Sequence, residues 1–402
     1  MTWDPVKLGD ICDFQNGFAF KSSLFKEAGK PIVRISNIQN QTIDTNKIVF
    51  FNPENYEIDF AKYEIKPNDL LIAMSGATTG KIGFNNTDTT FYLNQRVGNL
   101  KPNSSLDKKY LYYFLSTKVE ENLNISKGAA QPNLSSEQIK NIDISLPPLT
   151  IQKQIVEKLD AAFADIDKAI SATEKNIENA EALFQSYLNQ IFETKGEGWE
   201  SSTIEEAFMI KPSKSEFKEF PLNSQVSFMG MNKLGINQKY SIPEEVRDLE
   251  KVFKNYTYFS ENDVLLAKIT PCFENGKLGI AKELKNGIGF GSSEFVVLRT
   301  KSSISNEWLY YFLSRDEFRE SGKKVMTGAV GHKRVPKEFI EKSVINFPKL
   351  KSQEYIITNF EFLQEKTSKL KELSKDKINN LVALKSSLLN QAFSGELTKD
   401  AA

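Results

Sequence analysis

The sequence predicts an α+β protein in which two β-rich domains alternate with two long helices that form an antiparallel coiled coil. Three observations support this fold class. Two long stretches lack both glycine and proline and carry apolar residues at helical spacing. The remaining sequence consists of short strand-like runs separated by turn residues, and both kinds of segment occur twice. The duplication predicts an internal repeat with pseudo-two-fold symmetry.

The first predicted helix covers residues 150–195 and follows Pro147 and Pro148. Its apolar residues recur at steps of three and four from Ile151 and Ile155 onward, which is the spacing of a coiled-coil seam. At about 1.5 Å per residue this helix would be on the order of 65 Å long, more than a compact domain needs from one helix. We therefore expect it to separate other parts of the protein.

The second predicted helix covers residues 350–394 and repeats this pattern. It follows Pro348, and its end resembles the end of the first helix, since Leu-Asn-Gln-Ala-Phe at 389–393 corresponds to Leu-Asn-Gln-Ile-Phe at 188–192. Two isolated helices with apolar seams would not remain exposed, so we expect them to pack on each other. Antiparallel pairing fits the connectivity, because a whole domain lies between them in the chain.

The segments ahead of the two helices also correspond. Residues 110–116 match 308–314, and residues 69–73 match 263–267. Short β-branched and aromatic runs, for example 32–35 and 295–298, are broken by Gly, Asn, Pro and Ser, which is typical of a β-rich α+β domain. The predicted order is a domain at 1–149, a helix at 150–195, a domain at 196–349, a helix at 350–394 and a tail at 395–402.

The composition argues against several classes of function. With 52 basic and 52 acidic residues the formal charge is zero, so any nucleic-acid binding must come from local patches or partner subunits. Cys12, Cys272 and His332 are the only cysteines and the only histidine, too few for a disulfide framework or a thiolate metal site. Because we find neither a stretch of about 20 apolar residues nor a signal peptide, we expect a cytoplasmic protein without a membrane partner.

Motifs that resemble catalytic sites fail on inspection. Residues 76–82 resemble a phosphate-binding loop, but they are one residue short between the glycines and carry Ile82 in place of Ser or Thr, so we expect a turn between strands. Asp59, Glu64 and Lys66 resemble a nuclease motif that the second copy lacks. The sequence has no Asn-Pro-Pro-Tyr segment to hold a flipped adenine. We therefore predict no catalytic residue, metal or cofactor on this chain.

Essentially the whole chain resembles the DNA-specificity subunit of type I restriction-modification enzymes. The resemblance rests on the two proline-led helix openings, the two long helices and the sequence Gln-Ala-Phe-Ser-Gly-Glu-Leu at 391–397. Residues 266–277 and 289–295 are similar to a recurring version of the second recognition domain in that family. The resemblance implies that each β-rich domain is a target-recognition domain that reads one half of a bipartite site in double-stranded DNA.

The resemblance also implies partners. The paired helices would set the spacing between the half-sites and dock methyltransferase (modification) subunits, two of them, which bind S-adenosylmethionine and methylate adenine. A motor-nuclease (restriction) subunit is a further partner that the resemblance allows. The second helix opening departs from the first, with Gln353-Glu354-Tyr355 in place of Gln152-Lys153-Gln154, so the two docking faces need not be equal.

Candidate DNA contacts come from residue type. Phosphates are bound by Lys, Arg and backbone amides, whereas Arg favours guanine and Asn or Gln favours adenine. The alternative for each candidate is an ordinary polar loop residue. The candidates in the first domain are Ser75, Thr78, Thr79, Lys81, Asn94, Gln95, Arg96, Lys127, Gln131 and Asn133, and those in the second are Lys268, Asn275, Lys277, Ser292, Ser293, His332, Lys333 and Arg334.

Two apolar features also have alternative interpretations. The aromatic runs at 110–114 and 308–312 could stack on bases, but their recurrence in two domains that should read different sequences favours a shared core. Apolar residues off the helix seams exceed what a two-stranded coiled coil buries and suggest docking of a partner. These partner-binding candidates are Val156, Phe163, Leu183, Phe362 and Leu373.

The leading hypothesis is a non-catalytic DNA-recognition subunit of a type I restriction-modification complex. The alternative from another class is a protein–protein scaffold, in which the helix pair recruits partners and the β-rich domains bind protein. A weaker alternative is a fragment of a single-chain restriction enzyme, which the lack of a nuclease or methyltransferase motif disfavours.

Overall fold

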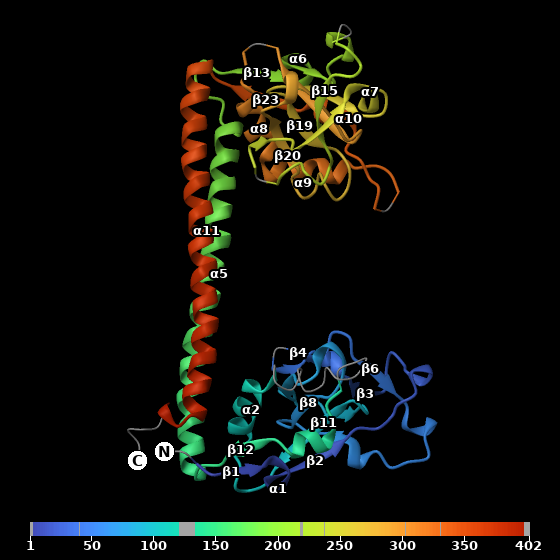
Figure 1. Ribbon diagram of the computed structural model, residues 1–402, viewed down its shortest axis with the longest axis vertical. Helices are drawn as coiled ribbons and strands as arrows, with labels where there is room; N and C mark the ends of the chain where they lie inside the picture. The colour runs from blue at the N-terminus through green and yellow to red at the C-terminus, as the bar shows by residue number, and fades with distance from the viewer. Residues whose placement is uncertain are drawn as a thin grey trace. The chain divides into compact units, whose positions relative to one another are not determined.

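The computed structural model describes residues 3–39, 41–119, 133–217, 220–236, 238–301, 303–329 and 331–397. The chain divides into two compact units, Met1–Thr173 with Asp376–Ala402 and Glu174–Lys375. Each unit contains one β-rich domain and a part of each long helix, α5 (Leu149–Glu193) and α11 (Leu350–Phe393) (Figure 1). We call the residues that precede α5 the first domain and those between α5 and α11 the second domain.

Within its described residues the first domain contains a six-stranded sheet, a four-stranded sheet and one strand pair. The larger sheet, with six strands, has the order β2-β11-β8-β9-β5-β4, and the smaller sheet, with four strands, has the order β6-β3-β10-β7. The remaining pair is β1 with β12. The strands are β1 (Pro5–Lys7), β2 (Cys12–Asn16), β3 (Lys30–Val33), β4 (Ile38–Gln39), β5 (Thr42–Ile43), β6 (Val49–Phe51), β7 (Glu64–Ile65), β8 (Leu70–Ala73), β9 (Ile82–Phe84), β10 (Phe91–Leu93), β11 (Val97–Pro102) and β12 (Asp143–Ser145).

The second domain has the same kinds of sheet. Their orders are β14-β22-β19-β20-β16 and β17-β15-β21-β18, and β13 pairs with β23. The strands are β13 (Glu200–Thr203), β14 (Phe208–Ile210), β15 (Gln225–Met229), β16 (Tyr240–Ser241), β17 (Glu245–Asp248), β18 (Thr257–Ser260), β19 (Val264–Ala267), β20 (Leu278–Ala281), β21 (Ile288–Gly291), β22 (Phe295–Thr300) and β23 (Val344–Phe347).

Within the described residues the two domains repeat one topology, except that the larger sheet of the first domain carries the additional edge strand β4. In both, the smaller sheet has a parallel central pair, β3 with β10 and β15 with β21, between antiparallel outer strands. In both, the larger sheet contains one parallel pair among antiparallel ones, β5 with β9 and β16 with β20. This correspondence confirms the predicted internal repeat and the α+β class.

Short helices cover these sheets. They are α1 (Leu8–Ile11), α2 (Lys108–Thr117) and α4 (Ser136–Lys140) in the first domain, and α6 (Ile204–Ala207), α7 (Leu249–Val252), α8 (Asn306–Ser314), α9 (Asp316–Val325) and α10 (Lys337–Lys342) in the second. The two aromatic runs form α2 and α8, which are capped by Asp107 and Ser305. Tyr110 and Trp308 are 0% exposed within these helices, which confirms that the runs belong to the core.

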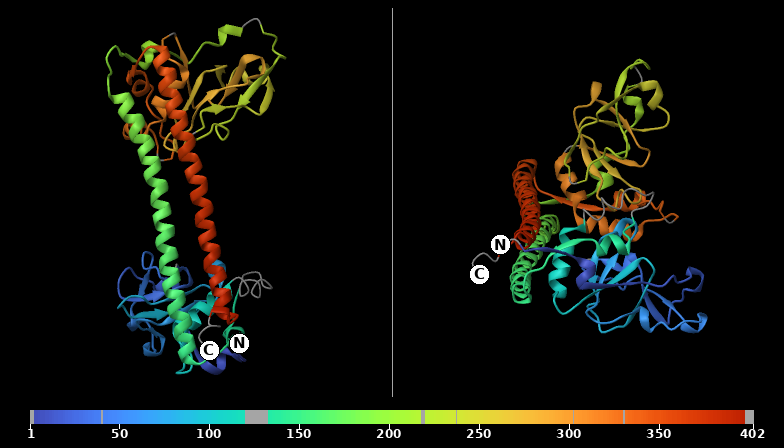
Figure 2. Two further views of the ribbon diagram at one scale, coloured as in Figure 1. Left: turned by 90° about the vertical axis from the view of Figure 1, so that its left-hand side faces the viewer. Right: turned by 60° about the horizontal axis from the view of Figure 1, so that its bottom comes forward.

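The long helices pair in antiparallel fashion within each unit (Figure 2). In the first unit Lys385 forms an ion pair with Asp167, and Lys158 Nζ donates a hydrogen bond of 2.9 Å to the carbonyl oxygen of Leu397. In the second unit Lys371 forms an ion pair with Glu181. A residue further along α5 therefore pairs with a residue earlier in the C-terminal part of the chain: 158 with 397, 167 with 385 and 181 with 371. This order confirms the predicted antiparallel pairing.

Each domain shares its core with the helix pair. Ile155 and Leu159 of α5 are buried with Ala392 of α11 in the core of the first domain. Leu188 of α5 and Phe360 of α11 are buried in the core of the second domain. The helices are therefore fixed to each domain by apolar burial. In the described part of the chain, none of the helices combines the length and hydrophobicity that a membrane crossing requires.

Candidate nucleic-acid interface

In the first domain three predicted DNA contacts meet at the end of β8. Ser75 forms an isolated antiparallel bridge with Asn133, and Arg96 Nη1 donates to Asn133 Oδ1 at 3.1 Å. The backbone beneath them is fixed at Met74, whose N–H donates to Arg96 O at 2.9 Å and whose carbonyl oxygen accepts from Leu134 N at 2.7 Å. The turn between β10 and β11 is thus joined to the segment that precedes α4.

We call the two backbone hydrogen bonds that Met74 makes, to Arg96 and from Leu134, the backbone frame of the first domain. The second domain repeats this frame around Lys268, at the end of β19. Lys268 N donates to Glu294 O at 3.0 Å, and Val335 N donates to Lys268 O at 2.9 Å. The side chains across the frame again form a bridge, because Arg334 donates to both carboxylate oxygens of Glu294, at 2.9 and 2.7 Å. The hydrogen bonds from Arg334 lower the pKa of Glu294 below its ordinary value.

The two frames place different chemistry at corresponding positions. Strand register and backbone hydrogen bonds match Arg96 with Glu294 and Asn133 with Arg334. In the first domain Arg96 donates to the neutral amide of Asn133. In the second domain the same two positions hold Glu294 and Arg334, which form an ion pair with two hydrogen bonds. One scaffold can therefore present different donors and acceptors without a change in its backbone, as two domains that bind different sequences require.

The other predicted contacts vary in exposure. Lys81 donates to Gln39 Oε1 at 3.1 Å, Lys277 donates to Met231 O at 2.6 Å, and Lys268 donates to Ser293 O at 3.2 Å. The exposed candidates are Lys81, Gln95, Arg96, Asn133, Asn275, Ser293, His332, Lys333 and Arg334, and the half-buried ones are Ser75, Thr78, Asn94, Lys268, Lys277 and Ser292. Lys127 and Gln131 lie outside the described residues.

Thr79 is buried and does not face a ligand. Its residue surface is 0% exposed, and its hydroxyl donates to Gly76 O at 2.7 Å. It closes a short 3-10 turn at Gly76–Thr78 between β8 and β9, which is the predicted turn in place of a phosphate-binding loop. Because the side chain does not reach the surface of this fold, Thr79 is wrong as a surface contact.

A basic cleft of about 710 Å³ lies in the second domain. Its lining includes Lys211, Lys214, Lys254, Lys268 and Lys337 and contains no Asp or Glu. We call this feature the lysine cleft. In the described part of the chain Lys337 is paired with Glu341, whereas no ion pair is found for the other four lysines. Of these lysines only Lys268 was predicted as a contact, because they come from separate segments that only the fold brings together.

Lys214 is held inside the lysine cleft by aromatic rings. Its ammonium lies 5.4 Å from the ring centroid of Phe253 and 5.6 Å from that of Phe290, and it donates to Phe253 O. Burial, followed by repulsion from Lys211, lowers the pKa of Lys214. Lys214 thus adds positive charge to a cleft in which Lys211, Lys254 and Lys268 also form no ion pair within the described residues.

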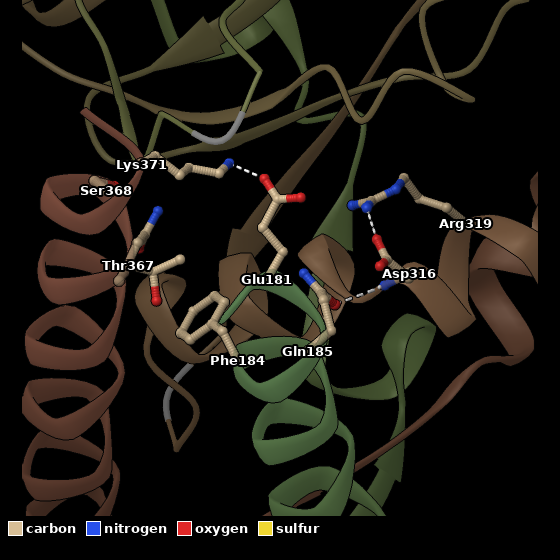
Figure 3. Close-up of a pocket in the computed structure, with 9 residues that line it drawn as sticks. Glu181, Phe184, Gln185, Asp316, Arg319, Thr367, Ser368 and Lys371 are labelled. Atoms are coloured by element: carbon tan, nitrogen blue, oxygen red, sulfur yellow. Dashed lines mark hydrogen bonds and ion pairs between the residues drawn. The ribbon is translucent and has the colours of Figure 1, made fainter. Parts of the chain in front are cut away.

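A second pocket, of about 270 Å³, lies between the helix pair and α9 (Figure 3). Glu181 pairs with Lys371, and Asp316 pairs with Arg319 while its backbone N–H donates to Gln185 Oε1 at 3.0 Å. Its charged side chains are thus paired with one another. This arrangement is that of a structural contact that ties the second domain to the helices.

The predicted partner-binding residues divide into two groups. Val156 is 8% exposed in the core of the first domain, and Phe163 packs against that core with its ring centroid 5.5 Å from that of Tyr113. Val156 is wrong as a docking residue, because its own domain covers it. Phe163 is only half-buried and stays a prediction. Leu183, Phe362 and Leu373 are 71%, 56% and 57% exposed.

Leu183 also lines an apolar groove between the two helices in the second unit. The groove has a volume of about 350 Å³ and is lined on the α11 side by Leu363 and Leu370. Leu370 is 41% exposed. Large apolar side chains that remain this exposed along a helix pair are typical of a protein-binding face.

No group of three or more His, Cys, Asp or Glu residues that could hold a metal ion was found within the described residues.

The comparisons with known proteins agree on one family. The profile of the Type I restriction modification DNA specificity domain matches residues 1–179 and 196–381. The EcoAI specificity subunit of Escherichia coli is 37% identical over 179 residues, which is 44% of this chain and 30% of that protein, so the match spans less than a third of that relative's length. The EcoKI specificity subunit of Escherichia coli (strain K12) is 23% identical over 98% of this chain and 89% of its own.

Two solved structures share the fold. One comes from a study of complex assembly and conformational transition of the type I R-M system, with a TM-score of 0.75, 19% identity and coverage of 98% of both chains. The other is the HsdS subunit from Thermoanaerobacter tengcongensis, with a TM-score of 0.58, 19% identity and coverage of 98% of this chain and 97% of its own. Since the profile matches both domains and most of the sequence, the chain belongs to the family of type I restriction modification DNA specificity proteins.

Proposed function

We propose that this chain is the DNA-recognition subunit of a type I restriction-modification complex and that each domain reads one half of a bipartite site. The observation that carries this proposal is the separate match of the family profile to 1–179 and to 196–381, two copies of one topology. A protein with two homologous binding domains on one chain is suited to a target with two separate parts. The chain itself would perform no chemistry.

The side chains at the two corresponding frames support different half-sites. Arg96 is available to a guanine edge or a phosphate, and Asn133 can present its amide to adenine. In the second domain Arg334 is held by Glu294, so its outward donors are fixed in direction. Two domains with one backbone and different polar groups would read different bases at equivalent places.

The helix pair would dock the modification subunits and fix the gap between the half-sites. The exposed apolar side chains of Leu183, Leu370 and Phe362 support a docking role, because a chain that acted alone would gain by burying them. S-adenosylmethionine would bind to the modification subunits, two of which would dock, and a restriction subunit would be the further partner that cuts. Antiparallel pairing supports a ruler, since the register of the seam sets its length.

The test is to purify the full chain with the modification subunit of its host and to map DNA protection. The expected result is a complex that protects two short sequences separated by an unprotected gap of constant length. A complex that forms but protects no DNA would contradict the proposal and favour the protein scaffold. Protection of one continuous sequence would contradict the division into half-sites.

A further inference from the structure

We infer that the lysine cleft of the second domain binds backbone phosphates of the target duplex and positions that domain on its half-site. This inference rests on the proposed function. It adds to that function a specific surface, with Lys211, Lys254 and Lys268 as the phosphate-binding groups. It also separates phosphate binding from base reading, because the bridge of Arg334 with Glu294 lies on the neighbouring frame.

The lysine cleft has an excess of positive charge. Five lysines line one concave surface of about 710 Å³ that has no carboxylate in its lining, in a chain whose formal charge is zero. Within the described residues only Lys337 of the five forms an ion pair, with Glu341. Like charges gathered in a concave site repel one another, and the low-dielectric walls strengthen that repulsion. A polyanion placed in the cleft would relieve it, and each lysine that meets a phosphate would release a counterion from the DNA.

Lys268 lies where the lysine cleft meets the backbone that presents Arg334. Its backbone joins the frame that carries Glu294 and Val335, and its side chain reaches the cleft, where Nζ donates to Ser293 O at 3.2 Å. That single neutral acceptor leaves two of the three ammonium donors for a ligand. Lys268 therefore connects the cleft with the segment that presents Arg334, so phosphate binding and base contact are positioned by one backbone.

The first domain has neutral residues where the second domain has two lysines of the cleft. Strand register matches Lys211 with Gln15, and the conserved backbone frame matches Lys268 with Met74. The shared fold therefore does not require a lysine at either position, because the first domain adopts it with a neutral residue at both. Of the two domains, only the second has a positive charge at these two positions. A charge that the fold does not require is expected where a surface binds a ligand.

Aromatic side chains complete the site. Lys214 is fixed by the rings of Phe253 and Phe290, and Tyr256 and Tyr258 also line the cleft. Cation–π contacts hold an ammonium in place without neutralising it. Lys214 thus adds to the positive potential of the cleft, and the exposed Lys211 and Lys254 are left, with Lys268, to meet the phosphates.

The test uses the full chain in complex with its modification subunit and the duplex that carries its methylated site. The affinity is measured by fluorescence anisotropy at several salt concentrations. In the variant, Lys211→Gln, Lys254→Gln and Lys268→Gln are combined, which keeps side-chain length and removes three charges. Because each phosphate-bound lysine contributes about one to the slope of log K against log salt, the slope should fall by about three. The loss should be the same for the target and for unrelated duplexes.

A matched variant combines Lys233→Gln, Lys285→Gln and Lys323→Gln, three exposed lysines of the second domain that do not line the cleft. It loses the same charge and should retain the wild-type slope. An equal fall of the slope in both variants, or no fall in the cleft variant with unchanged thermal stability, would overturn the inference. If the wild-type complex itself shows no DNA binding, the proposed function fails, so the two failures are distinguishable.

Discussion

Gln152 and Gln353 make the same three hydrogen bonds at the starts of the two long helices. The amide oxygen of Gln152 accepts from Asp107 N at 2.7 Å, and its amide nitrogen donates to Ser105 O at 2.9 Å and Pro147 O at 2.8 Å. Gln353 accepts from Ser305 N at 2.9 Å and donates to Ser303 O and Pro348 O, both at 2.8 Å. Both side chains are buried, so one glutamine joins each helix to the cap of the aromatic helix beside it.

Replacement of Gln152 by alanine should lower the free energy of unfolding. It would leave one backbone N–H and two carbonyl oxygens without their side-chain partner in a buried place, which costs roughly 2–5 kcal/mol in sum. Urea unfolding of the full chain measures this change. Gln154→Ala, at an exposed position two residues later, is the matched control and should change stability by less than about 0.5 kcal/mol. Equal effects of the two substitutions would contradict the role of the glutamine.

Charge placed in the apolar groove should prevent docking of the modification subunit. Leu183→Asp combined with Leu370→Asp puts two carboxylates where a partner would have to bury them, which is unfavourable without a paired cation. Co-purification from cells that express both subunits measures docking, and we expect the partner to be lost from the variant. Asn176→Asp adds charge on an exposed part of α5 that does not line the groove and should keep the partner. Retention of the partner by both variants would argue against this face.

Stability should fall steeply at alkaline pH. Burial raises the pKa of Tyr112 and of Tyr310 to about 12, whereas an exposed tyrosine titrates near 10. Above pH 10 the unfolded chain loses protons that the folded chain keeps, so the free energy of unfolding decreases as pH rises toward 12, by roughly 2–3 kcal/mol per tyrosine. Tyr310→Phe should remove its share of that decrease, measured by urea unfolding at pH 8 and pH 11.

The control for this pH dependence is Tyr355→Phe, because Tyr355 is 71% exposed. It should leave the alkaline decrease unchanged. If Tyr310→Phe and Tyr355→Phe behave alike, burial of Tyr310 is not the cause of the alkaline sensitivity.

The two cysteines should differ in reactivity. Cys12 is 4% exposed, and burial raises the pKa of its thiol to about 12, so the thiolate form is scarce at pH 8. Cys272 is half-buried. With iodoacetamide at pH 8, mass spectrometry should find Cys272 alkylated well before Cys12, and both alkylated in urea. Labelling of Cys12 at the rate of Cys272 in the native protein would show that Cys12 is accessible.

Longer helices should lengthen the gap between the half-sites. One heptad inserted into both α5 and α11 at paired positions preserves the seam and adds about 10 Å of helix, equivalent to about three base pairs. Methylated sites mapped in cells with the variant should keep both half-site sequences and gain about three base pairs between them. An unchanged gap would refute the role of the helix pair as a ruler.

Much of the fold could be predicted from the sequence because local signals determine it. The helices are marked by proline at 147 and 348 and by long stretches without glycine or proline. The burial of Tyr110 and Trp308 followed from the recurrence of the aromatic runs. By contrast, Val156 was misassigned because the helix pattern does not show which turns of α5 its own domain covers.

The lysine cleft could not be predicted, since it depends on sheet topology. Lys211 follows β14, Lys268 follows β19 and Lys337 begins α10, so these residues are far apart in the chain and share no motif. Mixed parallel and antiparallel pairing brings them together, and periodicity does not reveal that pairing. The burial of Thr79 was also missed, because a threonine in a polar turn gives no sign of which way it faces.

The division of recognition between two domains is tested most directly by mapping adenine methylation across the host genome with and without this chain. Strains that express the wild-type chain or the cleft variant with three Lys→Gln substitutions complete the comparison. The account predicts a two-part motif with a gap of constant length that disappears when the chain is removed and is methylated less completely in the cleft variant. A methylation map that is unchanged by removal of the chain would contradict it.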